Sequence, residues 1–191
     1  MPLMPVNALN RILTWGDFTQ KNLPAPAPGT SITAAETQVN ISSTGIRFIP
    51  VPGSAPRQFR LDQEPTVTVN FLKRSWVANF VFTWSQADQS ALLDHEQTHY
   101  LIAALSARDF FNELLAIRKR DYSSSQAGIA DVKAAQKLLI NQDIQDKYDQ
   151  DTKHLPTVNV MVQQVWSQNV QATLRFNQPL RAQLKRATLI R

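Results

Sequence analysis

The sequence contains no cysteine and only three histidines among its 191 residues. A disulfide framework and a thiolate zinc site are therefore excluded, and any metal site must use histidine and carboxylate ligands. No apolar run approaches the roughly 18 residues that a membrane-spanning helix needs. The first residues also lack a basic segment followed by an apolar one, so no signal peptide is visible. We expect no membrane span, and composition leaves the compartment undetermined.

The charge balance and the apolar content indicate the broad class of protein. The chain carries 20 basic and 15 acidic residues, a net charge of +5, and 43% of its residues are hydrophobic. This length and apolar content predict a single domain, residues 1–191, with a proper core. The basic excess is modest and comes without a zinc-finger or RNA-binding motif, so we expect no nucleic-acid partner. The basic residues 118–120 suit a helix C-terminus, where they face the negative end of the helix dipole.

Residues 94–100, which read Asp-His-Glu-Gln-Thr-His-Tyr, hold two of the three histidines. Four residues make about one helical turn, so on a helix His95 and His99 project from the same face. That arrangement can supply two nitrogen ligands to one zinc ion, and Glu96 is then placed to take a proton from a metal-bound water. The motif predicts a Zn²⁺ site with Glu96 as a catalytic residue. The alternative is an ordinary helix whose two histidines happen to lie one turn apart.

Alternating polar and apolar residues indicate strands in residues 31–83. The pattern is present in residues 37–42, 45–50 and 66–71, with a turn signal between the last two and an apolar group at 80–82. We expect these strands to form a small antiparallel sheet with one buried face.

Apolar residues at spacings of three and four predict mainly helices over residues 85–175. Ser85 and Asp88 resemble a capping pair at the start of the first helix. That helix would run for about 35 residues, which is long, so we expect a break at Ser90 or Ser106. After a loop at residues 122–128, helices are expected at about 129–150 and again from 158. Residues 177–191 are expected to form a solvated, partly frayed tail.

A third metal ligand must come from elsewhere in the chain. His154, the remaining histidine, follows a predicted helix and would complete a catalytic site of three protein ligands plus water. Asp149 and Asp151 are alternatives, either as ligands or as hydrogen-bond acceptors for an imidazole. On a continuous helix, Asp109 and Glu113 would lie about 15 and 21 Å beyond His99, too far to share an ion whose bonds are about 2 Å.

Tyr148 lies six residues before His154. Its hydroxyl could donate a hydrogen bond to the oxyanion that develops during attack on a carbonyl, and we treat it as a candidate catalytic residue. The alternative is a tyrosine that packs against the end of a helix.

Several motifs in order along the chain resemble one bacterial family. They are Trp-x-Asp-Phe at residues 15–18, Ser-Trp-Val at 75–77, the histidine motif at 95–99, and Tyr-Asp-x-x-Thr-x-His at 148–154. The family is a domain of unknown function described as predicted, often secreted, zinc-dependent proteases, and the similarity spans nearly the whole chain. One departure is Leu155, where the family often has glycine.

The resemblance implies a zincin-like peptidase site that contains His95, Glu96, His99 and His154, and a periplasmic or secreted location. The combined prediction is an α+β fold, in which a small antiparallel sheet packs on a helical half that carries the histidine motif. Its function would be hydrolysis of peptide bonds in a peptide or protein substrate by zinc-activated water, with Glu96 as general base. The alternative is a non-catalytic zinc-binding or protein-interaction domain that keeps the same ligands. A basic module for nucleic acid or anionic lipid is a third possibility. The oligomeric state does not follow from the sequence.

Overall fold

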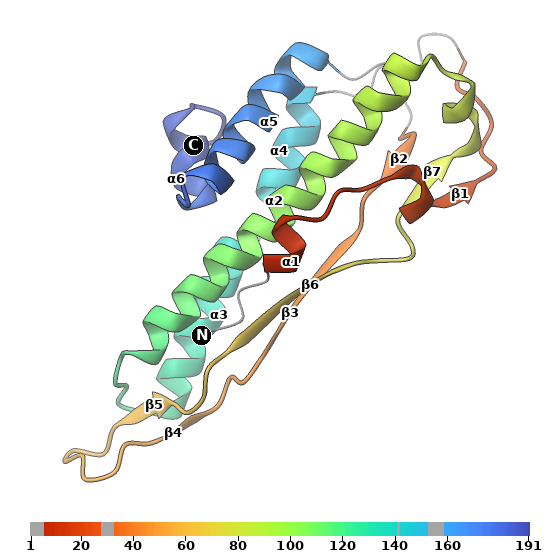
Figure 1. Ribbon diagram of the computed structural model, residues 1–191. Helices are drawn as coiled ribbons and strands as arrows, with labels where there is room; N and C mark the ends of the chain where they lie inside the picture. Colours follow the sequence, from red (N-terminus) through yellow and green to blue (C-terminus); the bar gives the residue numbers. More distant parts are fainter. Residues whose placement is uncertain (1–5, 28–32, 141, 153–158) are drawn as a thin grey trace.

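The computed structural model describes residues 6–27, 33–140, 142–152 and 159–191. Its longest element is helix α2, Gln86–Arg118, which runs diagonally through the molecule. Strands lie along one side of α2, and helices α4 to α6 lie on the other side (Figure 1). The chain is therefore a mixed α+β protein, as predicted, and the central helix is the element that carries the histidine motif.

The strands form three separate pairings. The order is β1–β7–β2 in the first sheet, β3–β6 in the second and β4–β5 in the third. The bounds are β1 Thr19–Lys21, β2 Ala35–Glu36, β3 Val39–Thr44, β4 Phe48–Pro50, β5 Phe59–Leu61, β6 Thr66–Phe71 and β7 Trp76–Ala78. The prediction of a single antiparallel sheet is wrong in two respects, since the pairings are separate and β1 pairs with β7 in parallel. The strand predicted at residues 66–71 is confirmed.

Helix α2 begins where the capping pair predicted. The Ser85 hydroxyl oxygen accepts a hydrogen bond from the Asp88 amide at 3.2 Å and donates one to the Asp88 carboxylate at 2.7 Å. The predicted break at Ser90 or Ser106 is wrong, because α2 continues for 33 residues. The length limit applies to isolated helices, whereas α2 buries apolar side chains against strands and helices along most of its length.

The remaining helices differ from expectation at their ends, and the region predicted to be helical at about 129–150 contains parts of two separate helices. They are α1 Val6–Leu9, α3 Ser125–Leu139, α4 Asp143–Thr152, α5 Val160–Arg175 and α6 Leu180–Arg186, with short 3-10 helices at Trp15–Asp17 and Asn79–Thr83. Helix α3 begins inside the segment expected to be a loop, because the Ser124 hydroxyl caps it by accepting from the Ala127 amide. The expected frayed tail contains α6, whose Leu180 and Leu184 are buried. Its ordering reflects this apolar contact with the core.

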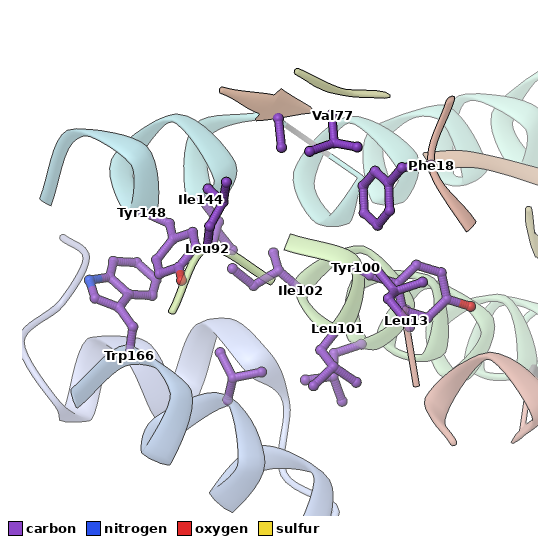
Figure 2. Packing of buried hydrophobic residues seen from close by; sticks show 14 of the residues in the cluster. Leu13, Phe18, Val77, Leu92, Tyr100, Leu101, Ile102, Ile144, Tyr148 and Trp166 are labelled. Atoms are coloured by element: carbon purple, nitrogen blue, oxygen red, sulfur yellow. The ribbon is translucent and has the colours of Figure 1, made fainter. Parts of the chain in front are cut away.

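Two buried apolar clusters share α2. The first surrounds the N-terminal and middle part of the helix and includes Leu92, Ile144, Tyr148 and Trp166, whose side chains meet in Figure 2. The second lies around the C-terminal part of α2 and includes side chains of β4, β5, β6 and α3. In the ranges that the structure describes, no helix is both long and apolar enough to cross a membrane.

Candidate metal centre

Three ligand atoms converge where α2 faces α4. The Nε2 atoms of His95 and His99 lie 2.9 Å apart. Asp149 of α4 places Oδ1 at 2.8 Å from the His99 Nε2 and at 3.3 Å from the His95 Nε2. In a tetrahedral site with bonds of about 2.0–2.1 Å, neighbouring ligand atoms lie about 3.3 Å apart. The triangle therefore has nearly the size of one face of a zinc coordination sphere.

The hydrogen bonds of Gln145 fix the tautomer of His99. The side-chain Nε2 of Gln145 donates to the His99 carbonyl oxygen at 3.0 Å. The amide oxygen of Gln145 must then face the His99 ring, where it contacts Nδ1. Because that oxygen can only accept, Nδ1 carries a proton, and in the neutral ring Nε2 presents its lone pair to the other two ligands. This is the arrangement in which outer hydrogen bonds orient a metal-binding histidine.

The second histidine is held by residues of α4. The His95 side chain is fully buried, and its ring stacks on Tyr148 with centroids 4.6 Å apart and an interplanar angle of 18°. Thr152 donates its hydroxyl proton to the Tyr148 carbonyl at 2.7 Å, which leaves the hydroxyl oxygen able to accept from the His95 Nδ1 at 3.5 Å. Helix α4 therefore holds both imidazoles and supplies the carboxylate.

The charges around His99 favour a cation at this position. Burial lowers the pKa of His99, but the hydrogen bond with Asp149 and the charges of Glu96 and Asp149 raise it, and the net direction is upward. The negative charges of Glu96 and Asp149 would stabilise either a proton on His99 or a bound metal ion, since both place positive charge beside these two carboxylates. The site is therefore built to hold positive charge.

A cavity of about 460 Å³ adjoins the ligand atoms. Its lining includes His99 and Asp149 together with Glu96, which is buried within α2. Residues of β2 and β3 line the opposite side, including Ala35, Val39 and Ile41. The predicted general base is therefore among the lining residues of the same cavity as two of the candidate ligands.

The other predicted site residues lie in different surroundings. His154 lies outside the residues that the structure describes, so its assignment as a ligand stays a prediction. Tyr148 is fully buried between His95 and Trp166 and is not among the lining residues of the cavity. Burial raises the pKa of its hydroxyl well above the ordinary value. Its role as an oxyanion donor also stays a prediction.

The aspartates considered as ligands differ in the partners that their side chains contact. Asp151 forms an ion pair with Lys147 and accepts a hydrogen bond from the Trp166 indole at 3.1 Å. Asp109 pairs with Arg108 further along α2. Within the described residues, His95, His99 and Asp149 are the group whose ligand atoms all lie within 4.8 Å of one another.

Sequence reasoning ranked Asp149 below His154 as the third ligand. A signal for Asp149 was present, because Gln145, Asp149 and Thr152 recur at spacings of four and three and so share one face of α4. All three side chains contact the histidines of α2.

Comparisons with known proteins identified no relative. No family model, no curated protein and no solved structure matches the chain.

Proposed function

We propose that this protein is a zinc-dependent metallopeptidase of the zincin type. The observation that supports the proposal is the convergence of the His95 Nε2, the His99 Nε2 and the Asp149 Oδ1 beside a cavity that Glu96 also lines. Imidazole nitrogens and a carboxylate oxygen are a ligand set that zinc accepts in catalytic sites. Three such ligands leave one position for water or substrate.

Each residue has a distinct part in the proposed reaction. A bound zinc ion supplies Lewis acidity, which lowers the pKa of water and polarises a carbonyl. Glu96 takes a proton from the attacking water as its oxygen adds to the peptide carbonyl carbon, and it later gives that proton to the nitrogen of the leaving amine. Gln145 and Thr152 keep the imidazoles oriented, and the stacked ring of Tyr148 supports His95 from behind.

The edge of β2 and β3 offers a place for an extended substrate. Ala34 accepts from the Ala78 amide, and Gln38 accepts from the Leu72 amide and donates to the Ser75 hydroxyl, so these even-numbered residues point their backbone groups into the sheet. Because backbone groups alternate between the two edges of a strand, Thr37 and Val39 point theirs the other way. Both residues line the cavity. A peptide could therefore add as a strand along this edge.

A Glu96→Gln variant tests the proposal. Gln keeps the shape of the side chain but cannot accept a proton, so the variant should bind zinc stoichiometrically and lose hydrolysis of a peptide library by about 10²–10⁴-fold. Zinc content by elemental analysis and cleavage by mass spectrometry provide the two readouts. A zinc-loaded wild type that cleaves no peptide would instead support the non-catalytic zinc-binding alternative.

A matched pair of variants tests the third ligand. We infer that Asp149 binds the metal, so Asp149→Ala should weaken zinc binding far more than His154→Ala does. The reverse order, measured by competition with a chromophoric chelator, would assign the third position to His154 and leave Asp149 as its hydrogen-bonding neighbour.

A further inference from the structure

The cavity beside the metal centre extends well beyond the three candidate ligand atoms. On α2 its lining continues from His99 through Ala103 to Ser106. Steps of four and three residues place these side chains on one face of the helix. Seven residues of helix span about 10 Å. The cavity therefore runs along α2 from the metal centre towards the C-terminal end of that helix.

Helix α4 and the residues before it form a second wall over the same distance. Thr152, at the end of α4, contacts His95. Gln145, earlier in α4, contacts His99, which lies one turn further along α2. The two helices therefore run in opposite directions. Ile140 also lines the cavity and comes five residues before Gln145, so it lies further along α2 than the metal centre does.

Strand β3 forms the third wall and runs beside α2 in the same direction (Figure 1). Just before this strand, the Thr37 hydroxyl donates to the Glu96 carbonyl oxygen at 3.4 Å. Ile41 lies four residues further on, about 13 Å along an extended chain, and packs against the apolar cluster around the C-terminal part of α2. Ile41 and Ile140 therefore lie on opposite walls at about the level of Ser106. These three residues define the distal part of the cavity.

The distal part is apolar, unlike the part at the metal centre. Ile41 and Ile140 are half-buried and line the cavity, so part of their apolar surface is open to it. Two of the acidic lining residues, Glu96 and Asp149, lie at the metal centre. The third, Glu36, directs its carboxylate to an indole of β7. No lysine or arginine is found in the lining that the structure describes.

Ser106 adds one polar group to the distal part. Its exposed fraction is 7%, and it lines the cavity. Thr98 in α2 and Thr173 in α5 each donate to the carbonyl oxygen four residues earlier at 2.9 Å. By contrast, the Ser106 hydroxyl has no hydrogen-bond partner among the residues that the structure describes. Because a buried hydroxyl without a partner is unfavourable, this group is placed to bond with a molecule that enters the cavity.

We propose that the distal part of the cavity binds an apolar side chain of the peptide substrate, and that the Ser106 hydroxyl bonds to the backbone of the same peptide. The inference rests on the proposed peptidase function. An extended peptide rises about 3.3 Å per residue, so the 10 Å or so between His99 and Ser106 correspond to about three residues. Because one methylene in an apolar pocket changes kcat/KM about tenfold or more, leucine at that distance from the cleaved bond should exceed alanine by at least about tenfold.

The first test compares zinc-loaded wild type with Ala103→Leu and Ala116→Leu. Leucine at residue 103 would fill space inside the cavity, whereas Ala116 makes the same change on α2 outside the described lining. Leucine is a good helix former at both positions. The substrates are fluorogenic peptides that differ only in leucine, alanine, lysine or aspartate at the third residue on either side of the cleaved bond. The preference for leucine should disappear in Ala103→Leu and persist in Ala116→Leu.

A Ser106→Ala variant tests the hydroxyl separately. Loss of one neutral hydrogen bond to the peptide backbone should lower kcat/KM by about 2–10-fold for leucine and alanine peptides alike. The denaturation midpoint of the variant should not fall, because the hydroxyl bonds to no described residue of the chain. A lower midpoint with unchanged kcat/KM would show that the hydroxyl has a structural role and does not bind substrate.

Failure of this inference differs from failure of the proposed function. Cleavage without a preference for leucine, or a preference that survives in Ala103→Leu, would overturn the apolar subsite and leave the peptidase intact. If wild type cleaves none of the peptides, the peptidase proposal fails, and fluorescence anisotropy then measures binding of the same peptides to the zinc-loaded protein. Tighter binding of leucine peptides, lost in Ala103→Leu, would support the subsite, and equal binding or no binding would overturn it.

Discussion

Two groups of buried polar side chains lie on α2, and they differ in which atoms complete their hydrogen bonding. Arg108 and Asp109 form one group. The Arg108 guanidinium donates to Asp109 Oδ1 at 2.7 and 3.0 Å and to the carbonyl oxygens of Thr173 and Gln178. Asp109 Oδ2 accepts from the Leu180 amide at 2.6 Å. The hydrogen-bonding groups of Arg108 and Asp109 are thus paired with other groups of the chain, and these hydrogen bonds connect α2 to the start of α6.

The candidate metal centre differs from this pair, because it brings together three atoms that could all bind one metal ion. The Nε2 atoms of His95 and His99 and the Oδ1 atom of Asp149 lie 2.8–3.3 Å from one another. When both imidazoles are neutral with the proton on Nδ1, all three atoms are acceptors, and they repel one another unless a proton or a metal cation lies among them. The hydrogen bonds of the Arg108–Asp109 pair are therefore completed within the chain, whereas the group around His99 could hold a cation.

Removing Asp109 should produce the largest effect of this comparison. An Asp109→Ala change leaves the Arg108 charge buried without its carboxylate, which costs about 3–5 kcal/mol of the free energy of unfolding. Chemical denaturation measures this loss. Zinc affinity of the folded variant should match that of wild type, and a parallel loss of zinc affinity would show that the two groups are coupled.

The reciprocal change is His99→Ala. Loss of one of three ligands should weaken zinc binding by about 10²–10³-fold, equivalent to about 3–4 kcal/mol, as measured with a competing chelator. The metal-free variant should unfold at nearly the same denaturant concentration as metal-free wild type. A large loss of stability without metal would mean that the histidines act mainly as core residues.

A Gln145→Ala change sharpens the comparison, because Gln145 orients a ligand without being one. Losing such an outer hydrogen bond typically weakens metal binding about 10–100-fold. Gln142→Ala is a matched control, since that glutamine also lines the cavity, whereas among the described residues it is Gln145 whose side-chain amide bonds to both the ring and the carbonyl of His99. Equal zinc affinity in the two variants would show that the hydrogen bonds of Gln145 do not orient His99 for metal binding.

Local sequence signals predicted those features that depend on neighbours in the chain. Ser85 and Asp88 indicated the start of α2, and the spacing of His95 and His99 predicted that one face of that helix would carry both rings. The continuity of α2 through Ser106 was not predictable from these signals. It depends on packing against elements that lie far away in the sequence.

The same limit applies to the sheet and to the third ligand. The parallel pairing of Thr19 with Trp76 joins residues 57 positions apart, and no local pattern specifies it. Asp149 was an alternative to His154 because it lies five residues before it in the sequence. Its approach to His99 depends on how α4 docks onto α2, and alternation or spacing cannot supply that information.

The smallest expected effect concerns pH. A histidine must lose its proton before Nε2 can bind a metal, so protons compete with zinc. The pKa of His99 lies above its ordinary value of 6.5 because the Asp149 hydrogen bond and the Glu96 charge outweigh burial. Apparent zinc affinity should therefore begin to fall near neutral pH as the solution is acidified, by up to about tenfold per pH unit for each proton displaced.

Chelator competition between about pH 6 and 8 measures this slope. An affinity that is flat over the same range would show that no proton occupies the centre in the metal-free protein and would contradict the raised pKa of His99.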